Sequence, residues 1–124
     1  MKKKVLIVDD EEEIIAFMER FLKRLKISSI CATSGEQAIA LYDKKEIGFV
    51  FLDIKMGGMD GLTALEKIRQ IDPEVKAIII TGNVSSSFTE KAKSLGALDY
   101  ITKPLDLSEF KAKVDKYIIN DTSQ

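Results

Sequence analysis

The distribution of apolar residues along the chain predicts five β-strands. Three segments, VLIVD, FVFLD and AIIIT, are almost continuously apolar, as strands buried on both faces of a sheet should be. A fourth segment, SSICAT, is more polar, so we expect it at an edge of the sheet. The expected strands are Lys4–Asp9, Ser29–Thr33, Phe49–Asp53, Lys76–Thr81 and Leu98–Thr102.

Between the expected strands, apolar residues recur at the three- and four-residue spacing of amphipathic helices. Pairs of capping residues mark the starts of three helices: Ser34 with Gln37, Ser87 with Glu90, and Asp106 with Glu109. Another helix spans Leu62–Ile71 and ends before a proline. The predicted buried stripes include Ile14, Met18, Phe21 and Leu25 in the first helix, Ala38, Leu41 and Tyr42 in the second, Phe88, Ala92 and Leu95 in the fourth, and Leu107, Phe110, Val114 and Tyr117 in the last.

Strands and helices alternate from one end of the chain to the other. This order predicts an α/β fold, a doubly wound five-stranded parallel sheet with helices on both faces. We expect one domain over residues 1–120 and a polar, frayed tail over residues 121–124. Ligands of such sheets bind beyond the carboxyl ends of the strands, so the residues that close the strands are the candidates for function.

Composition excludes several functional classes. The 19 Lys and Arg residues against 20 Asp and Glu give a net charge of −1, which argues against a nucleic-acid binder because such a protein needs a basic face. No apolar run approaches the roughly 20 residues of a membrane span. Cys31 is the only cysteine, which suits a reducing cytoplasm. The chain has no His, so its chemistry is left to carboxylates, hydroxyls and lysines.

Five polar residues lie at the expected strand ends: Asp9, Asp10, Asp53, Thr81 and Lys103. Because the carboxyl ends of parallel strands lie on one edge of a sheet, these side chains should converge. Two carboxylates about 4 Å apart repel by roughly 4 kcal/mol at an effective dielectric of 20, and one lysine cannot neutralise three acids. Mg²⁺ prefers oxygen ligands, so we expect this cation among the three carboxylates.

The acids that follow, Glu11 to Glu13, have a simpler interpretation. They precede or open the first predicted helix, where negative charge complements the helix dipole. We therefore assign them no part in the site.

Four pieces of the chain, VLIVDDE, FLDIKMGGMDG, IIITG and YITKP, occur in this order and resemble the receiver domain of bacterial two-component response regulators over essentially the whole sequence. The resemblance implies a flavodoxin-like sheet of strand order 2-1-3-4-5, for which the chemotaxis member of this family is a standard example. It implies a cytoplasmic phospho-accepting domain that catalyses only its own phosphorylation and dephosphorylation. The phosphoryl donor would be a sensor histidine kinase or a phosphotransfer protein. A downstream protein or a second copy would bind the face made by the fourth helix, fifth strand and fifth helix.

The same resemblance implies a role for each strand-end residue. Asp53 would be the phospho-acceptor, and Lys103 would pair first with Asp53 and then with its phosphoryl group. Mg²⁺ would be held by Asp9, Asp10, Asp53 and the backbone carbonyl of Lys55. Asp10 would bind the cation directly, and Asp9 directly or through water.

The resemblance also implies a switch. Thr81 would bond a phosphoryl oxygen, and Tyr100 would then pack into the space that Thr81 vacates. Lys55 and Asn83 occupy the two positions that tune the lifetime of the phosphorylated form in this family. Gly57 stands where the family usually has proline, which predicts a looser loop after the third strand.

Three other functions are alternatives to the receiver. A Mg²⁺-dependent aspartyl phosphatase would use Asp53 as nucleophile, but it carries a second Asp two residues on, where this chain has Lys55. A flavodoxin-like cofactor binder needs free N–H groups for phosphate in its first loop, whereas DDEEE would repel phosphate unless a metal intervenes. A metal-binding protein without phosphotransfer is the third. Both a stand-alone regulator and a receiver excised from a longer regulator fit these residues.

Overall fold

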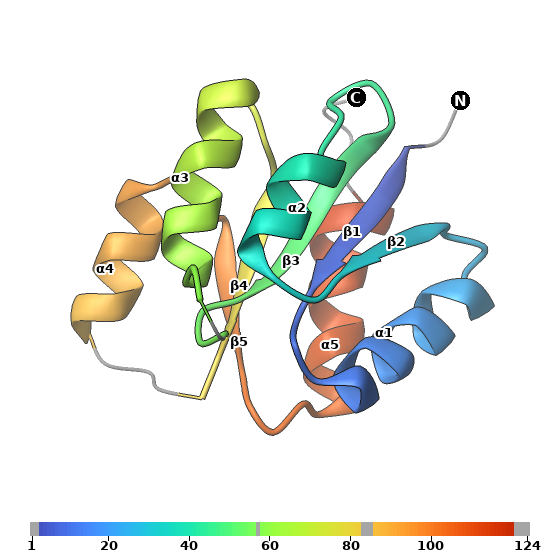
Figure 1. The fold of residues 1–124 in the computed structure, drawn as a ribbon. Helices are drawn as coiled ribbons and strands as arrows, with labels where there is room; N and C mark the ends of the chain where they lie inside the picture. The colour runs from blue at the N-terminus through green and yellow to red at the C-terminus, as the bar shows by residue number, and fades with distance from the viewer. Residues whose placement is uncertain (1–2, 57, 83–85, 121–124) are drawn as a thin grey trace.

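The computed structural model describes residues 3–56, 58–82 and 86–120, without the side chains of residues 86–89. Strands and helices alternate along the chain (Figure 1). The strands are β1 (Lys4–Val8), β2 (Ser29–Ala32), β3 (Ile47–Asp53), β4 (Ala77–Thr81) and β5 (Asp99–Thr102). The helices are α1 (Glu12–Arg24), α2 (Gly35–Leu41), α3 (Gly61–Ile71), α4 (Ser86–Ser94) and α5 (Leu107–Val114), which continues into a π-helical turn, η1 (Asp115–Ile119).

The strands form one parallel sheet of order β2-β1-β3-β4-β5, which confirms the predicted fold class and strand order. Helices α1 and α5 cover one face of the sheet, and α2, α3 and α4 cover the other (Figure 1). Two cores result. Phe51 of β3 meets Phe110 of α5 on the first face, with ring centroids 5.2 Å apart. Leu52 and Leu65 belong to the core on the second face.

The strand boundaries agree with the sequence prediction to within two residues. The polar strand β2 lies at an edge of the sheet, as expected. The largest difference is at the start of β3, which begins at Ile47 rather than Phe49. The cause is that β1 continues its pairing backwards: Lys4 stands opposite Ile47, and the Lys4 N–H donates to the Glu46 carbonyl at 2.7 Å.

Three predicted core residues are exposed instead: Leu25 (37%), Leu41 (39%) and Leu107 (49%). Each lies at a helix end, where no neighbouring helix or strand covers the side chain. The buried stripe of α1 is Ile15, Met18 and Leu22, one residue further along than predicted except at Met18. The spacing was correct, but its phase depends on how the helix is rotated against the sheet.

Side chains cap several helices. The Ser34 hydroxyl accepts a bond from the Gln37 N–H at 3.0 Å, and the Asp106 carboxylate accepts one from the Glu109 N–H at 3.1 Å, as predicted. Helix α4 begins at Ser86, one residue before the expected cap Ser87. The side chains of Ser87 and Phe88, predicted to cap the helix and to be buried, are outside the described part of the structure.

The start of α3 is fixed against the end of β3. The Gly61 N–H donates to the Ile54 carbonyl at 2.8 Å, and a Cβ at position 61 would lie 2.1 Å from the carbonyl oxygen of Asp53. A glycine is therefore needed here for the close approach of two backbone segments. This contact holds the loop that follows Asp53.

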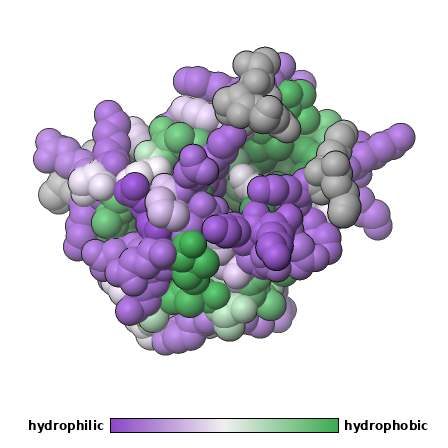
Figure 2. All heavy atoms as spheres, turned by 90° about the horizontal axis from the view of Figure 1, so that it is seen from above, coloured by the Kyte–Doolittle hydropathy of each residue, from purple (hydrophilic) through white to green (hydrophobic). Residues whose placement is uncertain are grey.

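The carboxyl ends of the strands lie at the bottom of Figure 1. The opposite edge, seen from above in Figure 2, is largely hydrophilic, with a few apolar patches between the polar side chains. Within residues 3–56, 58–82 and 86–120, no helix is long and apolar enough to cross a membrane. The predicted frayed tail, residues 121–124, is outside the described part of the chain.

Candidate functional site

Strand register brings Asp9 and Asp53 together. Val8 of β1 stands opposite Leu52 of β3, so the next residue of each strand also lies side by side at the same edge. Side chains alternate along a strand, and this alternation directs both carboxylates to the α1 and α5 side. Both acids are almost completely buried, with exposures of 0% for Asp9 and 2% for Asp53.

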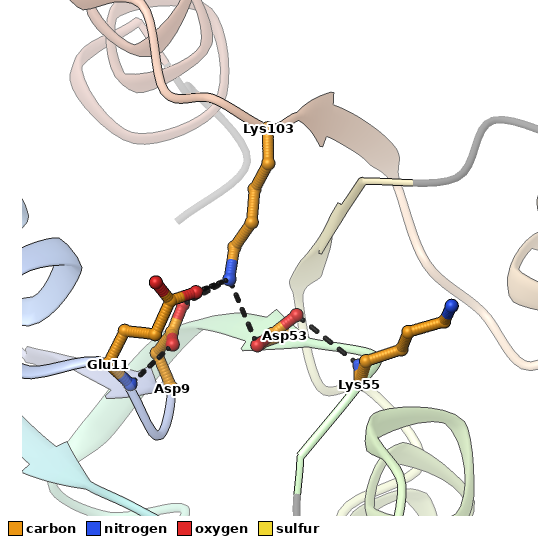
Figure 3. Close-up of polar contacts among 5 residues, drawn as sticks. All are labelled: Asp9, Glu11, Asp53, Lys55 and Lys103. Atoms are coloured by element: carbon orange, nitrogen blue, oxygen red, sulfur yellow. Dashed lines mark hydrogen bonds and ion pairs between the residues drawn. The ribbon is translucent and has the colours of Figure 1, made fainter.

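Lys103 reaches this pair from the end of β5 (Figure 3). Its ammonium lies 3.1 Å from Asp53 Oδ2 and 3.3 Å from Asp9 Oδ2. The backbone N–H of Lys103 donates to the Thr81 carbonyl at 2.8 Å, which anchors the base of the lysine to β4. The predicted contact between Lys103 and Asp53 is therefore present in the structure.

A third carboxylate contacts the same ammonium, and the sequence prediction for it was wrong. Glu11 was expected only to complement the helix dipole, but its Oε1 lies 2.7 Å from Lys103 Nζ. Helix α1 begins at Glu12, so Glu11 is the residue before the first turn and its side chain can lie over the strand ends. In a run of three consecutive glutamates, nothing local in the sequence distinguishes the first from the other two.

Burial dominates the electrostatics of the two strand-end acids. Burial, with the charge of Asp9 added, raises the pKa of Asp53 to about 6 although Lys103 opposes the shift. Burial also raises the pKa of Asp9, against a bond from the Glu11 N–H at 2.8 Å and the attraction of Lys103. Burial alone would lower the pKa of Lys103, but its bonds to Glu11 and Asp53 outweigh burial and raise that pKa. One ammonium thus leaves the cluster with excess negative charge.

The arrangement fits a hard divalent cation. Asp9, Asp10, Glu11 and Asp53 each place a carboxylate oxygen within 4.8 Å of the others. Asp9 Oδ2 is buried and accepts no hydrogen bond from the described residues, although Lys103 lies beside it. An all-oxygen donor set suits Mg²⁺ rather than a metal that prefers nitrogen or sulfur ligands.

Lys55 lies beside the cluster through its backbone. Its N–H points at Asp53 Oδ1, 3.3 Å away, whereas its side chain is exposed and turns away from the acids (Figure 3). The other two residues expected to shape this region, Gly57 and Asn83, lie outside the described residues.

Thr81 and Tyr100 share one face of the sheet. Thr81 closes β4 and is 4% exposed. Tyr100 of β5 stands opposite Ile79 and packs, half-buried, against the core beneath α2, α3 and α4. Because alternate residues of β4 face the same side, Thr81 lies on the face of Ile79. The register therefore places the two residues of the predicted switch on one side of neighbouring strands.

Comparison with known proteins agrees with this architecture. Residues 5–115 match the family described as response regulator receiver domain. Sporulation initiation phosphotransferase F of Bacillus subtilis is 33% identical over 118 residues, which cover 95% of each chain. Several other curated relatives are longer, and the chain spans between 25% and 54% of their length.

Two solved structures illustrate the likeness. A chain of the CheX–CheY–BeF3–Mg²⁺ complex from Borrelia burgdorferi superposes with a TM-score of 0.87 at 29% identity, covering 94% of this chain and 89% of that one. A chain of the co-crystal of the Saccharomyces cerevisiae histidine phosphotransfer protein Ypd1 with the receiver domain of Ssk1 superposes with a TM-score of 0.85 at 26% identity. It covers 94% of this chain and 88% of that chain.

Proposed function

The chain belongs to the response regulator receiver domain family, and from this premise we propose that it accepts a phosphoryl group on Asp53. The observation that carries the proposal is the contact of the Lys103 ammonium with Asp53, at 3.1 Å, in a cluster of acids of which Asp9 and Asp53 are buried. Burying carboxylates costs folding free energy, so their retention in the fold points to a function for their charge. A nucleophilic carboxylate beside a cationic side chain is such a function.

The transfer itself needs little covalent chemistry from the protein. A carboxylate oxygen of Asp53 forms a bond to the phosphorus of a phosphohistidine, and the phosphorus–nitrogen bond breaks. The imidazole leaves with the bonding electron pair and takes up a proton from its surroundings. Since this sequence contains no His, the donor lies outside it, and we propose a sensor histidine kinase or a phosphotransfer protein. Positioning and charge neutralisation provide the rate.

Lys103 supplies the neutralising charge that this chain itself holds. The backbone N–H of Lys103 is hydrogen-bonded to β4, and its ammonium already lies beside Asp53. The ammonium can therefore follow the phosphoryl oxygens over a short distance as a mobile point charge. Asp9, Asp10, Asp53 and the backbone carbonyl of Lys55 are the groups that would hold Mg²⁺. When bound, Mg²⁺ would neutralise charge on the transferring phosphoryl group.

The signal is proposed to leave through the sheet face shared by Thr81 and Tyr100. A phosphoryl group on Asp53 attracts the Thr81 hydroxyl, and Tyr100 moves into the space that opens. Packing then changes at the surface made by α4, β5 and α5, where a downstream protein or a second copy binds. A bistable element of this kind is what a local charge switch requires.

The lifetime of the phosphorylated state is proposed to depend on Lys55 and Asn83. The backbone N–H of Lys55 lies 3.3 Å from Asp53 Oδ1 and its side chain is exposed, which supports this role for Lys55. Changing either residue to alanine should alter the half-life of phospho-Asp53, measured by loss of the labelled mass. Equal half-lives in both variants and the parent would contradict this assignment.

The proposed function is tested by incubation with acetyl phosphate and Mg²⁺, followed by mass spectrometry of the intact protein. The parent should gain the mass of one phosphoryl group and lose it again with time. Asp53→Asn should stay unlabelled, while Asp115→Asn, the same change outside the cluster, should label as the parent does. A labelled Asp53→Asn protein would move the acceptor elsewhere, and steady turnover of simple phosphate esters would favour the phosphatase instead.

A further inference from the structure

The shortest contact of the Lys103 ammonium is made with Glu11 rather than with the proposed acceptor. The distance to Glu11 Oε1 is 2.7 Å, against 3.1 Å to Asp53 Oδ2 and 3.3 Å to Asp9 Oδ2. Figure 3 shows the ammonium held between the three carboxylates. Lys103 Nζ donates hydrogen bonds to Glu11 and Asp53, and Asp9 Oδ2 lies beside the same ammonium as an ion-pair partner.

Glu11 differs from the other two carboxylates in its freedom to move. Its side chain is 59% exposed, whereas those of Asp53 and Asp9 are 3% and 0% exposed. Its backbone is held, because its N–H donates to Asp9 Oδ1 and its carbonyl accepts from Ile14 and Ile15 at the start of α1. No other partner of the Glu11 carboxylate occurs among the described residues. The ion pair with Lys103 can therefore break by a side-chain rotation alone.

Phosphorylation of Asp53 changes what competes for Lys103. A phosphoryl group adds acceptor oxygens and negative charge beside the same ammonium, so the lysine must redistribute its three donors. The exposed partner is the easier one to give up, because water can solvate the Glu11 carboxylate after it leaves. Before transfer, the same contact draws Lys103 toward Glu11 and away from the incoming phosphoryl group.

We propose that Glu11 is a positioning residue that holds the Lys103 ammonium before phosphorylation and releases it when Asp53 carries a phosphoryl group. The inference rests on the proposed function, because it assumes that Lys103 assists transfer to Asp53. The lysine stays protonated throughout, and only its partner changes. Glu11 thus acts as a brake on phosphoryl acceptance, and removing its charge should speed the transfer.

The first test measures the rate of labelling by acetyl phosphate at saturating Mg²⁺ in Glu11→Gln, which keeps the shape of the side chain but removes its charge. The expected rate is about two- to fivefold above that of the parent, the range set by an exposed ion pair. Glu12→Gln and Glu13→Gln remove the same charge from neighbouring exposed positions in the first turn of α1. Their rates should stay close to the parent rate, which separates release of Lys103 from weaker repulsion of the donor.

The second test follows Lys103 directly, without phosphoryl transfer. The ammonium resonance of Lys103 is recorded by ¹⁵N–¹H NMR in cation-free protein and assigned by its loss in Lys103→Arg. Glu11→Gln should shift this resonance and speed its hydrogen exchange with water, whereas Glu12→Gln should leave it unchanged. A structural effect confined to α1 would not move this signal.

The outcomes separate the brake from the proposed function. An unshifted Lys103 resonance in Glu11→Gln, or a labelling rate equal to that of Glu12→Gln, overturns the role of Glu11 while leaving Asp53 as the acceptor. A slower Glu11→Gln protein overturns it too, since the contact would then assist transfer. A parent protein that takes no label overturns both, because a brake then has nothing to act on.

Discussion

Replacing Asp53 by asparagine should make the cation-free protein more stable. The change removes a negative charge from a side chain that is 2% exposed and lies beside buried Asp9. Asparagine has nearly the same shape as a protonated aspartic acid, so the core and the Gly61 contact beneath it are left in place. The variant therefore behaves as an Asp53 that is permanently uncharged.

The magnitude follows from the pKa of Asp53. Burial and the charge of Asp9 raise this pKa from 3.8 to about 6, a difference of about 2 pKa units, and each unit corresponds to about 1.4 kcal/mol. The ionised carboxylate thus costs the folded state about 3 kcal/mol, to order of magnitude, at pH values well above 6. Asp53→Asn should raise the free energy of unfolding by up to that amount.

The pH dependence has a definite sign. Because the folded pKa of Asp53 lies above the unfolded one, the folded state binds more protons between about pH 4 and 6, and the parent loses stability as the pH rises through this window. The gain from Asp53→Asn should be full near pH 7.5 and close to zero near pH 4. Urea unfolding followed by circular dichroism, in buffers with a chelator, measures both ends of the window.

Two controls complete this experiment. Asp115→Asn should change stability little at either pH, because Asp115 lies outside the cluster. Adding Mg²⁺ at neutral pH should stabilise the parent more than Asp53→Asn, because a ligand of the folded state stabilises it by mass action. A variant no more stable than the parent at neutral pH, or a difference that persists on acidification, would refute the reasoning that burial controls this site.

Three further predictions concern the surroundings of the site. Gly61→Ala should lower the free energy of unfolding by about 1–3 kcal/mol in urea titrations, because its Cβ would meet backbone atoms. Gly82→Ala serves as control, because its new methyl group would make only an ordinary contact, 3.9 Å from the Cβ of Lys103. Burial would raise the pKa of Asp99, but bonds from Lys113, the Tyr100 N–H and Tyr117 lower this pKa overall. The lowered pKa stabilises the folded state above the unfolded pKa near 3.8, and this stabilisation is lost as the pH falls through the folded pKa. Lys113→Met should therefore destabilise the protein more at neutral pH than at pH 3, by about 1 kcal/mol in urea. Thr81→Ala should weaken partner or dimer binding in the presence of a phosphoryl mimic, measured by light scattering, and undiminished binding would remove Thr81 from the switch.

The fold was largely predictable because its strands are defined by composition alone. A run such as the one ending at Asp53 is apolar on both faces, and only a sheet covered on both sides buries such a run. The helices could be predicted from the spacing of their apolar residues, but the residues that each helix buries could not. Leu25 and Leu107 fit the apolar spacing, yet they lie at helix ends, where exposure depends on the neighbouring loop. Local sequence contains the period of a helix and not its rotation against the sheet.

The site was predictable to the extent that strand ends determine it. Asp9, Asp53 and Lys103 follow strands whose carboxyl ends lie on one edge of a parallel sheet, and the order β2-β1-β3-β4-β5 brings these ends close together. Glu11 was missed because its partner lies 92 residues away along the chain. Whether an exposed carboxylate faces solvent or an ammonium is decided only after folding. The requirement for glycine at position 61 was missed for a related reason, because it arises from a backbone contact across a loop.

The cost of the buried charge and the signalling role proposed for it have one origin. A carboxylate that is unfavourable in the folded protein by about 3 kcal/mol gains most from whatever neutralises it, whether a proton, a divalent cation or the Lys103 ammonium. In the proposed role, Glu11 limits how much of that neutralisation Lys103 gives to Asp53 before transfer, since it makes the shortest contact with the same ammonium. Asp53→Asn removes the charge that needs neutralising, and Glu11→Gln leaves more of the Lys103 charge for Asp53. The first change should yield a more stable protein that accepts no phosphoryl group. The second should yield a faster acceptor whose Lys103 lies closer to Asp53.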